Sequence, residues 1–234
     1  MAKEDGIVVP SLTQKIIVPG IVLGREVENY RIQPKDPRVY RDAPTLAELR
    51  HAYFDKNPDG SFVSPEYRQS VLSKRGSGEW ASTFLRDGRE AVERPDRVYV
   101  DDKRGIWAAE GGKVAKVELP PEGWVLEYDM PTGFPSRTSQ NRRDAEEVFG
   151  DDASYFWYNN NSLRAVFRDF LLGASGPFCV LAFCVPDYWD SDVGVRSASR
   201  LEQDAKHLAM SVESGLTEVP TNQLYSELGR RLNL

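Results

Sequence analysis

The first 44 residues carry short aliphatic runs instead of a helical repeat. These runs lie at residues 7–9, 16–18 and 21–23. Pro10, Pro19 and Gly20 interrupt them, and proline restricts a strand to the edge of a sheet. We therefore expect residues 1–44 to form an extended arm. Its aliphatic side chains need a surface to cover, so we expect it to dock mostly on its own chain, with its outer edge open to a partner strand.

Helical signals begin after this arm. Thr45 and Glu48 have the spacing of a capping box and open a helix that runs towards Phe54. A second helix is predicted after Ser64 and Pro65, because serine caps a helix and proline is favoured at its first position.

Two further helices are predicted from apolar side chains at helical spacing. The first places Trp80, Phe84 and Leu85 on one side. Gly88 is expected to end it, so that residues 45–92 form a helical segment. The second covers residues 162–172, in which apolar residues follow the i, i+3, i+4, i+7, i+8 pattern: Leu163, Val166, Phe167, Phe170 and Leu171.

From residue 95 the hydrophobic pattern changes to a period of two, which is typical of strands. Strands are predicted at residues 97–100, 105–109, 113–119 and 124–128. Residues 101–104 and 110–112 have the composition of turns between them. The pattern predicts an antiparallel β-meander.

The rest of the chain alternates loop, helix and strand signals. The predicted elements are a Pro/Gly/Ser loop at 131–139, a helix near 140–149 ending at Gly150, an apolar strand at 178–185, and two C-terminal helices, the first opened by a capping box at 199–202.

These elements predict an α+β fold: an antiparallel β-meander packed by helices, with an extended N-terminal arm and a helical segment before the sheet. The expected division is an arm at 1–44, a helical segment at 45–92 and an α+β core with C-terminal helices at 93–234. One single domain is the alternative division, because 234 residues fit either arrangement.

Composition narrows the class of protein. With 40% hydrophobic residues the chain can bury a core. A net charge of −6 argues against general nucleic-acid binding, because phosphate contacts need clustered Lys and Arg. The chain has no run of about 18 apolar residues, so no membrane-spanning helix is predicted. The first residues lack a signal-peptide pattern and the chain has 2 cysteines, so we expect a soluble cytoplasmic or intracellular protein.

The stretch at residues 55–66 has the spacing of a calcium-binding loop. Oxygen ligands fall at loop positions 1, 3, 5, 7 and 12: Asp55, Asn57, Asp59, Ser61 through its carbonyl, and Glu66. Gly60 takes position 6, where such a loop turns sharply. With a predicted helix on each side, the stretch resembles an EF-hand loop. The resemblance implies that these residues bind one calcium ion.

The same residues are also typical of a turn between two helices that binds no ion. Asp, Asn and Gly are the usual turn formers. Pro58 at loop position 4 favours this interpretation, because its ring forbids a left-handed backbone. The sequence leaves both interpretations open.

A second group of carboxylates follows predicted strands. Asp187, Asp190 and Asp192 come directly after the apolar strand, and Glu127 lies at the end of another. Strand ends are where α/β-type active sites place metal ligands. Asp190 and Asp192 loosely resemble the D-x-D motif of nucleotide-sugar transferases. The alternative is a solvated acidic turn.

The cysteines and histidines do not have metal-site spacing. Cys179 and Cys184 lie five apart on one predicted strand, so they point to opposite faces and are expected to be buried thiols. His51 and His207 are far apart in the sequence.

Four consecutive aromatic residues occupy positions 155–158, and three asparagines follow at 159–161. Such a cluster can stack on a sugar or on a protein partner. It is more often used to fill a core or an interface.

We therefore expect a non-enzymatic interaction or assembly protein, with a protein partner or self-association, and with calcium as a candidate stabilising cofactor. The alternative is a metal-dependent hydrolase or transferase that uses the acidic cluster of Asp187, Asp190, Asp192 and Glu127.

Overall fold

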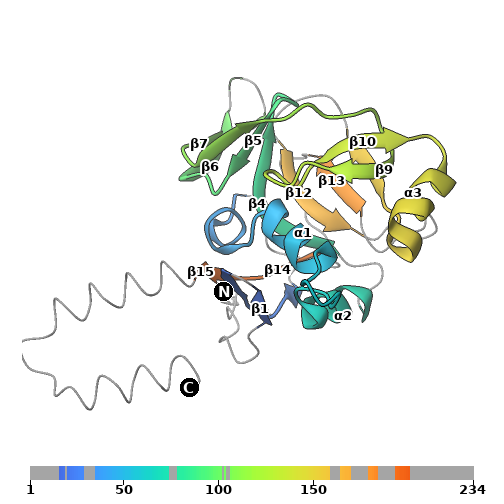
Figure 1. The fold of residues 1–234 in the computed structure, drawn as a ribbon. Coiled ribbons are helices and arrows are strands. Elements are labelled where there is room, and N and C mark those ends of the chain that lie inside the picture. The colour runs from blue at the N-terminus through green and yellow to red at the C-terminus, as the bar shows by residue number, and fades with distance from the viewer. Residues whose placement is uncertain are drawn as a thin grey trace, which may run out of the picture. The chain divides into compact units, whose positions relative to one another are not determined.

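The computed structural model describes residues 16–18, 20–28, 35–73, 78–101, 103, 106–158, 164–169, 179–183 and 193–200. The chain divides into two units after Ala198, and the arrangement described below concerns the first of them. Helices and mixed sheets are both present, which confirms the predicted α+β class (Figure 1). In the described part, no helix is long and apolar enough to cross a membrane.

The helical elements are η1 (Arg38–Asp42), α1 (Leu46–Phe54), α2 (Pro65–Ser73), α3 (Arg142–Phe149) and η2 (Gly150–Asp152). The strands before α3 are β1 (Ile16–Val18), β2 (Ile21–Leu23), β3 (Val27–Glu28), β4 (Gly78–Arg86), β5 (Glu90–Glu93), β6 (Arg97–Asp101), β7 (Ile106–Glu110), β8 (Lys113–Lys116), β9 (Gly123–Tyr128) and β10 (Pro135–Ser139). After α3 come β11 (Tyr155–Tyr158), β12 (Arg164–Asp169), β13 (Cys179–Phe183), β14 (Val193–Val195) and β15 (Ala198–Arg200).

One large mixed sheet organises the described fold. Its strand order is β10-β9-β11-β13-β12-β4-β14-β3, and β5 joins β8 to β4. The pairs β11–β13 and β4–β14 are parallel. The described antiparallel pairs of this sheet are β10–β9, β11–β9, β12–β13, β12–β4, β14–β3, β4–β5 and β5–β8. Helix α3 packs beside β9 and β10, away from β5 and the β6–β7 hairpin (Figure 1).

The predicted meander is correct for its first hairpin and wrong after it. β6 and β7 pair with each other, whereas β8 pairs with β5. Charge complementarity explains the partner, because Lys113 lies opposite Glu93 and Lys116 lies opposite Glu90. The Lys113 Nζ is 3.4 Å from a Glu93 carboxylate oxygen.

The predicted third helix is wrong, because residues 78–86 form β4. This strand is buried on both faces along nearly its whole length, so the alternation that identifies a strand is hidden. The informative signal is the Asp87-Gly88 pair, which favours a hairpin turn. Both residues have positive φ, at 52° and 64°, and the Arg89 N–H donates to the Arg86 carbonyl.

The helix predicted at 162–172 is also wrong in its described part, where residues 164–169 form β12. Both edges of this strand are used, since β12 pairs with β13 on one side and β4 on the other. The backbone hydrogen bonds to two neighbouring strands override the helical spacing of the apolar residues. A further difference is β10, which replaces part of the predicted loop at 131–139.

Three helix-end signals, at Thr45, Ser64 and Gly150, lie where they were predicted. The Thr45 hydroxyl accepts from the Glu48 N–H at 3.2 Å, and the Glu48 carboxylate accepts from the Thr45 N–H at 2.9 Å. The Tyr67 N–H donates to the Ser64 hydroxyl at 3.3 Å at the start of α2. Gly150 caps α3. Strands β9 and β13 confirm the predictions at 124–128 and 178–185.

The C-terminal helices lie outside the described residues, apart from their predicted start. Ser199 and Arg200 belong to β15, so the helix predicted to open at Ser199 does not begin there.

The described part of the N-terminal arm docks on its own chain. β1 and β2 form a hairpin through Gly20, whose φ is 78°. Val18, Ile21 and Leu23 belong to the main hydrophobic core, and β3 pairs with β14. This confirms docking in cis for residues 16–28, while residues 7–9 lie outside the described part. The short helical element η1 was not predicted.

Candidate ligand pocket

The EF-hand-like stretch folds into a small hairpin between α1 and α2. The Asn57 N–H donates to the Ser61 carbonyl at 2.8 Å, and the Gly60 N–H donates to the Asn57 carbonyl at 2.9 Å. Gly60 has a φ of 85°, which confirms the sharp turn predicted at this position. Lys56 and Phe62 form an antiparallel bridge at its base.

Side chains of the predicted ligand residues make hydrogen bonds within this hairpin or to α1, with Glu66 as the exception among the described residues of the loop. The Asp59 carboxylate accepts from the Ser61 N–H at 2.9 Å and from the Ser61 hydroxyl at 2.6 Å. These hydrogen bonds lower the pKa of Asp59. The Asn57 amide donates to the Ser61 hydroxyl at 3.0 Å, and the Asp55 carboxylate pairs with His51 Nδ1. Glu66 is exposed in the first turn of α2.

Within the described residues, no three carboxylate, imidazole or thiolate side chains converge as a metal-binding group. An EF-hand loop also uses amide and carbonyl oxygens, so this observation does not test the calcium prediction, which stays a prediction.

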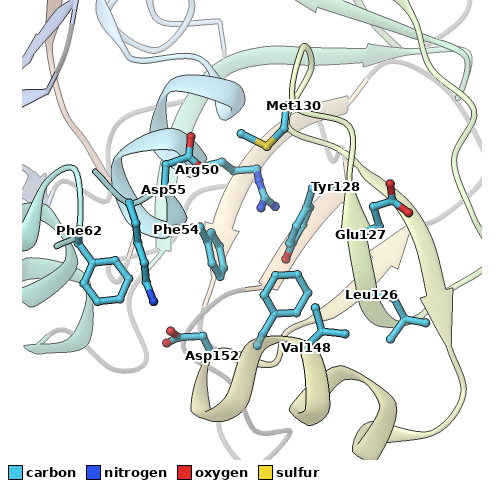
Figure 2. Close-up of a pocket in the computed structure, with 12 residues that line it drawn as sticks. Arg50, Phe54, Asp55, Phe62, Leu126, Glu127, Tyr128, Met130, Val148 and Asp152 are labelled. Carbon is cyan, nitrogen blue, oxygen red and sulfur yellow. The ribbon is translucent and has the colours of Figure 1, made fainter. Parts of the chain in front are cut away.

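A pocket of about 380 Å³ opens beside this hairpin, between α1, β9 and α3 (Figure 2). Four aromatic rings line it: Phe54, Phe62, Tyr128 and Phe149. Three aliphatic side chains add to its apolar wall: Leu126, Met130 and Val148. Five charged residues complete the lining: Arg50, Asp55, Lys56, Glu127 and Asp152.

The aromatic wall is a packed cluster of three rings from three different elements. The ring centroids of Phe54 and Tyr128 are 5.6 Å apart, and those of Phe54 and Phe149 are also 5.6 Å apart. Tyr128 and Phe149 are separated by 5.7 Å at an angle of 63°. These distances and angles are those of favourable ring contacts, so the three rings hold α1, β9 and α3 at a fixed spacing.

Arg50 provides a buried positive charge in the pocket wall. It projects from α1 and is only 2% exposed. Its guanidinium lies over the ring of Tyr128 and 4.8 Å from the ring centroid of Phe54, an arrangement visible in Figure 2. Burial lowers the pKa of Arg50 to about 10, although the Tyr128 hydroxyl and the charge of Asp55 act in the opposite direction.

The carboxylates of the lining are each placed beside another polar group. Asp152 accepts from the Tyr53 hydroxyl at 3.0 Å and from an Arg68 guanidinium nitrogen at 2.6 Å. Glu127 is 63% exposed and lies 3.7 Å from Arg137. These contacts hold Asp152 in the pocket wall and leave Glu127 at its solvent edge.

The structure locates one residue of the predicted acidic cluster. Glu127 is on β9, as expected, whereas Asp187, Asp190 and Asp192 lie outside the described residues. The hydrolase or transferase alternative therefore stays a prediction. Cys184 and His207 are also outside the described part.

The first three aromatic residues of the run, Tyr155 to Trp157, alternate between the two faces of β11. Phe156 is fully buried in the core, whereas Trp157 is 46% exposed. Tyr155 lies 5.3 Å from Trp124 and 6.3 Å from Trp157 between ring centroids. The run therefore fills the core on one side and forms an aromatic row on the other.

Arg50, Tyr128 and Phe149 are not among the site residues that the sequence predicts. A signal for Arg50 is present in α1, because its helical neighbours Leu46 and Tyr53 are both buried. A charged residue on a buried helix face calls for a special environment. The position of Asp55 and Phe62 next to this pocket was not predictable from the loop pattern.

Comparison of the chain with protein-family models, with curated proteins and with solved structures gave no match. Function is therefore inferred from the residues of the pocket and their contacts.

Proposed function

We propose that this chain is a non-enzymatic interaction protein that takes an apolar side chain of a protein partner into the pocket between α1, β9 and α3. The packed ring cluster of Phe54, Tyr128 and Phe149 is the observation that carries this proposal. It provides a fixed apolar surface inside a concave site, which is the usual composition of a binding pocket.

The size of the pocket supports the proposal. A volume of about 380 Å³ falls in the range of roughly 300–1,000 Å³ that is usual for ligand sites. This space is large enough for one aromatic or branched side chain together with the backbone that carries it.

The rim of the pocket extends the apolar surface towards solvent. Met130 is 47% exposed and Val148 is 54% exposed, although both are apolar. Exposed apolar side chains that adjoin a pocket are typical of a contact surface for a protein, because a small ligand covers only the inside of its pocket. Methionine at such a surface also adapts its shape to a partner.

The contacts of the charged lining groups support binding over catalysis. Asp152 is held by Arg68 and Tyr53, and Asp55 is held by His51. Groups in such contacts fix the geometry of the wall, in the way that second-layer hydrogen bonds fix a recognition site.

The three methionines of the chain offer a direct test, because selective ¹³C-methyl labelling gives one signal for each of them. Substitution Met130→Leu assigns the pocket signal. We expect titration with N-acetyl-phenylalaninamide, a neutral probe, to shift the Met130 signal in a saturable way and to leave the other two in place.

A matched pair of variants provides the control. Val148→Asp places a charge at the pocket rim and is expected to abolish the Met130 response. Val114→Asp makes the same change at a valine on β8 that is 46% exposed, and it should leave the Met130 response to the probe intact. A Met130 signal that does not move with the probe, or that moves equally in Val148→Asp, contradicts the proposal. A Met130 signal that shifts with protein concentration alone identifies a second copy of the chain as the occupant.

Calcium at residues 55–66 is proposed as a separate, stabilising role. At about a hundred times its Kd, an ion that binds only the folded state adds roughly 2.7 kcal/mol to the free energy of unfolding. We expect that gain to be lost in Glu66→Gln, which removes an exposed predicted ligand outside the pocket lining. Calorimetry without a binding isotherm at millimolar calcium would contradict it.

A further inference from the structure

We propose that the pocket recognises the C-terminal residue of a partner protein: Arg50 binds the terminal carboxylate, and the ring wall receives the apolar side chain of that same residue. This inference rests on the proposed function and adds the chemical identity of the group that enters the pocket.

The position of Arg50 carries the inference. Its guanidinium is in the inner wall and in contact with the rings of Phe54 and Tyr128, so an anion that reaches it has apolar groups on both sides. A ligand must therefore carry a charged group and an apolar group close together. A C-terminal residue meets this requirement, because its carboxylate and its side chain are both attached to the same Cα atom.

The electrostatics of the pocket leave a favourable place for an anion beside Arg50. The burial of this guanidinium outweighs the stabilising groups around it, as its lowered pKa shows. An incoming carboxylate reverses that imbalance and offers two oxygens to the planar guanidinium. Lys56 adds a second positive charge to the lining, next to the ring of Phe62.

The same electrostatics favour a carboxylate over a phosphate. Three carboxylates also line the pocket: Asp55, Glu127 and Asp152. Asp152 is paired with the Arg68 guanidinium, which reduces its repulsion of an anion with a single charge. A phosphate group with nearly two charges meets about twice that repulsion, and it carries no apolar side chain for the ring wall.

The exposed rim favours a protein terminus over a free carboxylic acid. Met130 and Val148 extend the apolar surface outside the pocket, where the residues that precede a C-terminus would lie. A small free acid fits inside the pocket and leaves that rim in water.

Two matched tripeptides test the charge requirement. Acetyl-Gly-Gly-Phe with a free carboxylate and the same peptide with a C-terminal amide differ in one group. Their dissociation constants can be measured from the ¹³C-methyl signal of Met130. We expect the dissociation constant of the acid to be at least about tenfold lower than that of the amide, because a hydrogen bond between charged groups contributes about that much to affinity.

Substitutions of Arg50 connect the preference to this side chain. Arg50→Met should bind acid and amide with equal affinity. Arg50→Lys should keep only part of the preference, because an ammonium group lacks the two-pronged geometry of a guanidinium. Arg89→Met removes the same charge from the exposed β4–β5 turn and should keep the full preference. An unchanged Met130 response to the amide shows that each variant retains its fold. If Arg50→Met does not fold, Arg50→Lys still tests the proposal. An Arg50→Lys variant that keeps the full preference for the acid over the amide contradicts it.

The outcomes separate this inference from the proposed function. If the unmodified protein binds acid and amide equally, the proposed carboxylate site is overturned, but the proposed apolar binding pocket is still supported. Binding of neither peptide overturns both. If N-acetyl-phenylalanine binds as tightly as the acid tripeptide, the ligand is a free carboxylic acid, and the proposal of a protein C-terminus is overturned. Inorganic phosphate that competes with the acid tripeptide at equal concentration overturns the choice of carboxylate.

Discussion

Two arginines are buried among the described residues, and their polar surroundings differ. Arg196 is 1% exposed and Arg50 is 2% exposed. The Arg196 guanidinium donates to Glu79 at 2.9 Å and to Glu26 at 3.3 Å, and also to the Gly24 carbonyl at 2.8 Å. Arg50 instead lies against aromatic rings in a pocket wall.

The pKa values of the two arginines move in opposite directions. Burial by itself lowers the pKa of Arg196, but the charge of Glu79, followed by Tyr67 and Glu26, raises it above its ordinary value. For Arg50 burial prevails, and the pKa falls to about 10. The neighbouring charges thus outweigh burial at Arg196, whereas burial outweighs the contributions of Tyr128 and Asp55 at Arg50.

The difference indicates two uses of the same residue type. Arg196 connects four segments that are distant in sequence, since Ser70 of α2 also accepts a hydrogen bond from it at 3.3 Å. It fixes the end of the N-terminal arm and α2 against β4 and β14. Arg50 is placed where a partner can reach its surroundings. Burial of a charge alone therefore does not distinguish the structural role of Arg196 from the binding role that we propose for Arg50, and the neighbouring groups do.

The largest expected effect that tests this comparison is the loss of Arg196. Arg196→Met should lower the free energy of unfolding by about 3–5 kcal/mol, because the substitution leaves the Glu26 and Glu79 carboxylates buried without their guanidinium. Urea unfolding measures the change.

An exposed pair provides the control for that measurement. Arg142 pairs with Glu146 at 2.6 Å, with the Arg142 side chain 51% exposed, and Arg142→Met should change stability by less than about 1 kcal/mol. Equal losses in both variants would mean that the Arg196 network is not a structural centre.

Arg50→Met is expected to have a much smaller effect on stability, within about 1.5 kcal/mol of the unmodified protein. Methionine keeps an unbranched chain in contact with Phe54 and Tyr128, and it removes the unfavourable burial of a charge. The same urea unfolding experiment applies. A loss as large as that of Arg196→Met would break the comparison and assign Arg50 to the structural framework.

The pH dependence of stability should distinguish the two arginines as well. Below about pH 10 Arg50 is charged in both the folded and the unfolded protein. As the pH rises further, the folded state releases the proton before the unfolded state does, so the stability of the unmodified protein should rise relative to Arg50→Met. The slope of that difference should be at most about 1.4 kcal/mol per pH unit. Parallel stability curves of the two proteins between pH 9 and pH 11 contradict this expectation.

The sequence predicts α1 and α3 through local end signals, although the capping box at 199–202 does not open a helix at Ser199. Thr45 and Glu48 mark the start of α1, and Gly150 marks the end of α3, because each acts on backbone groups within a few residues. β4 ends at the Asp87-Gly88 turn signal, but no local signal identifies the residues before it as a strand. A strand covered on both faces loses its alternation, and its apolar residues then also match a helical spacing.

The pocket is predictable to a smaller extent, because its residues are brought together by tertiary contacts. Arg50 and Phe54 meet Tyr128 and Phe149 only when α1 packs beside β9 and α3. The loop pattern pointed to residues 55–66, which form one wall of the site, but for a different chemistry. The calcium prediction for this loop and the proposed pocket therefore concern neighbouring residues but different chemistry, and each stays to be tested.

The smallest predicted effect compares the two tyrosines that lie under the arginines. The Tyr67 hydroxyl donates to a Glu79 carboxylate oxygen at 3.3 Å, and the Tyr128 hydroxyl pairs with that of Ser154. A hydrogen bond to a charged group contributes more than one between neutral groups. Tyr67→Phe should therefore lower the free energy of unfolding by about 1.5 kcal/mol, and Tyr128→Phe by about 0.5–1 kcal/mol. Each variant keeps its ring, so only the hydroxyl is tested by urea unfolding. The Tyr128 hydroxyl also hydrogen-bonds with Arg50. A larger loss in Tyr128→Phe would show that this contact stabilises the fold more than the Tyr67–Glu79 hydrogen bond does, and the contrast between the two arginines would then be one of degree.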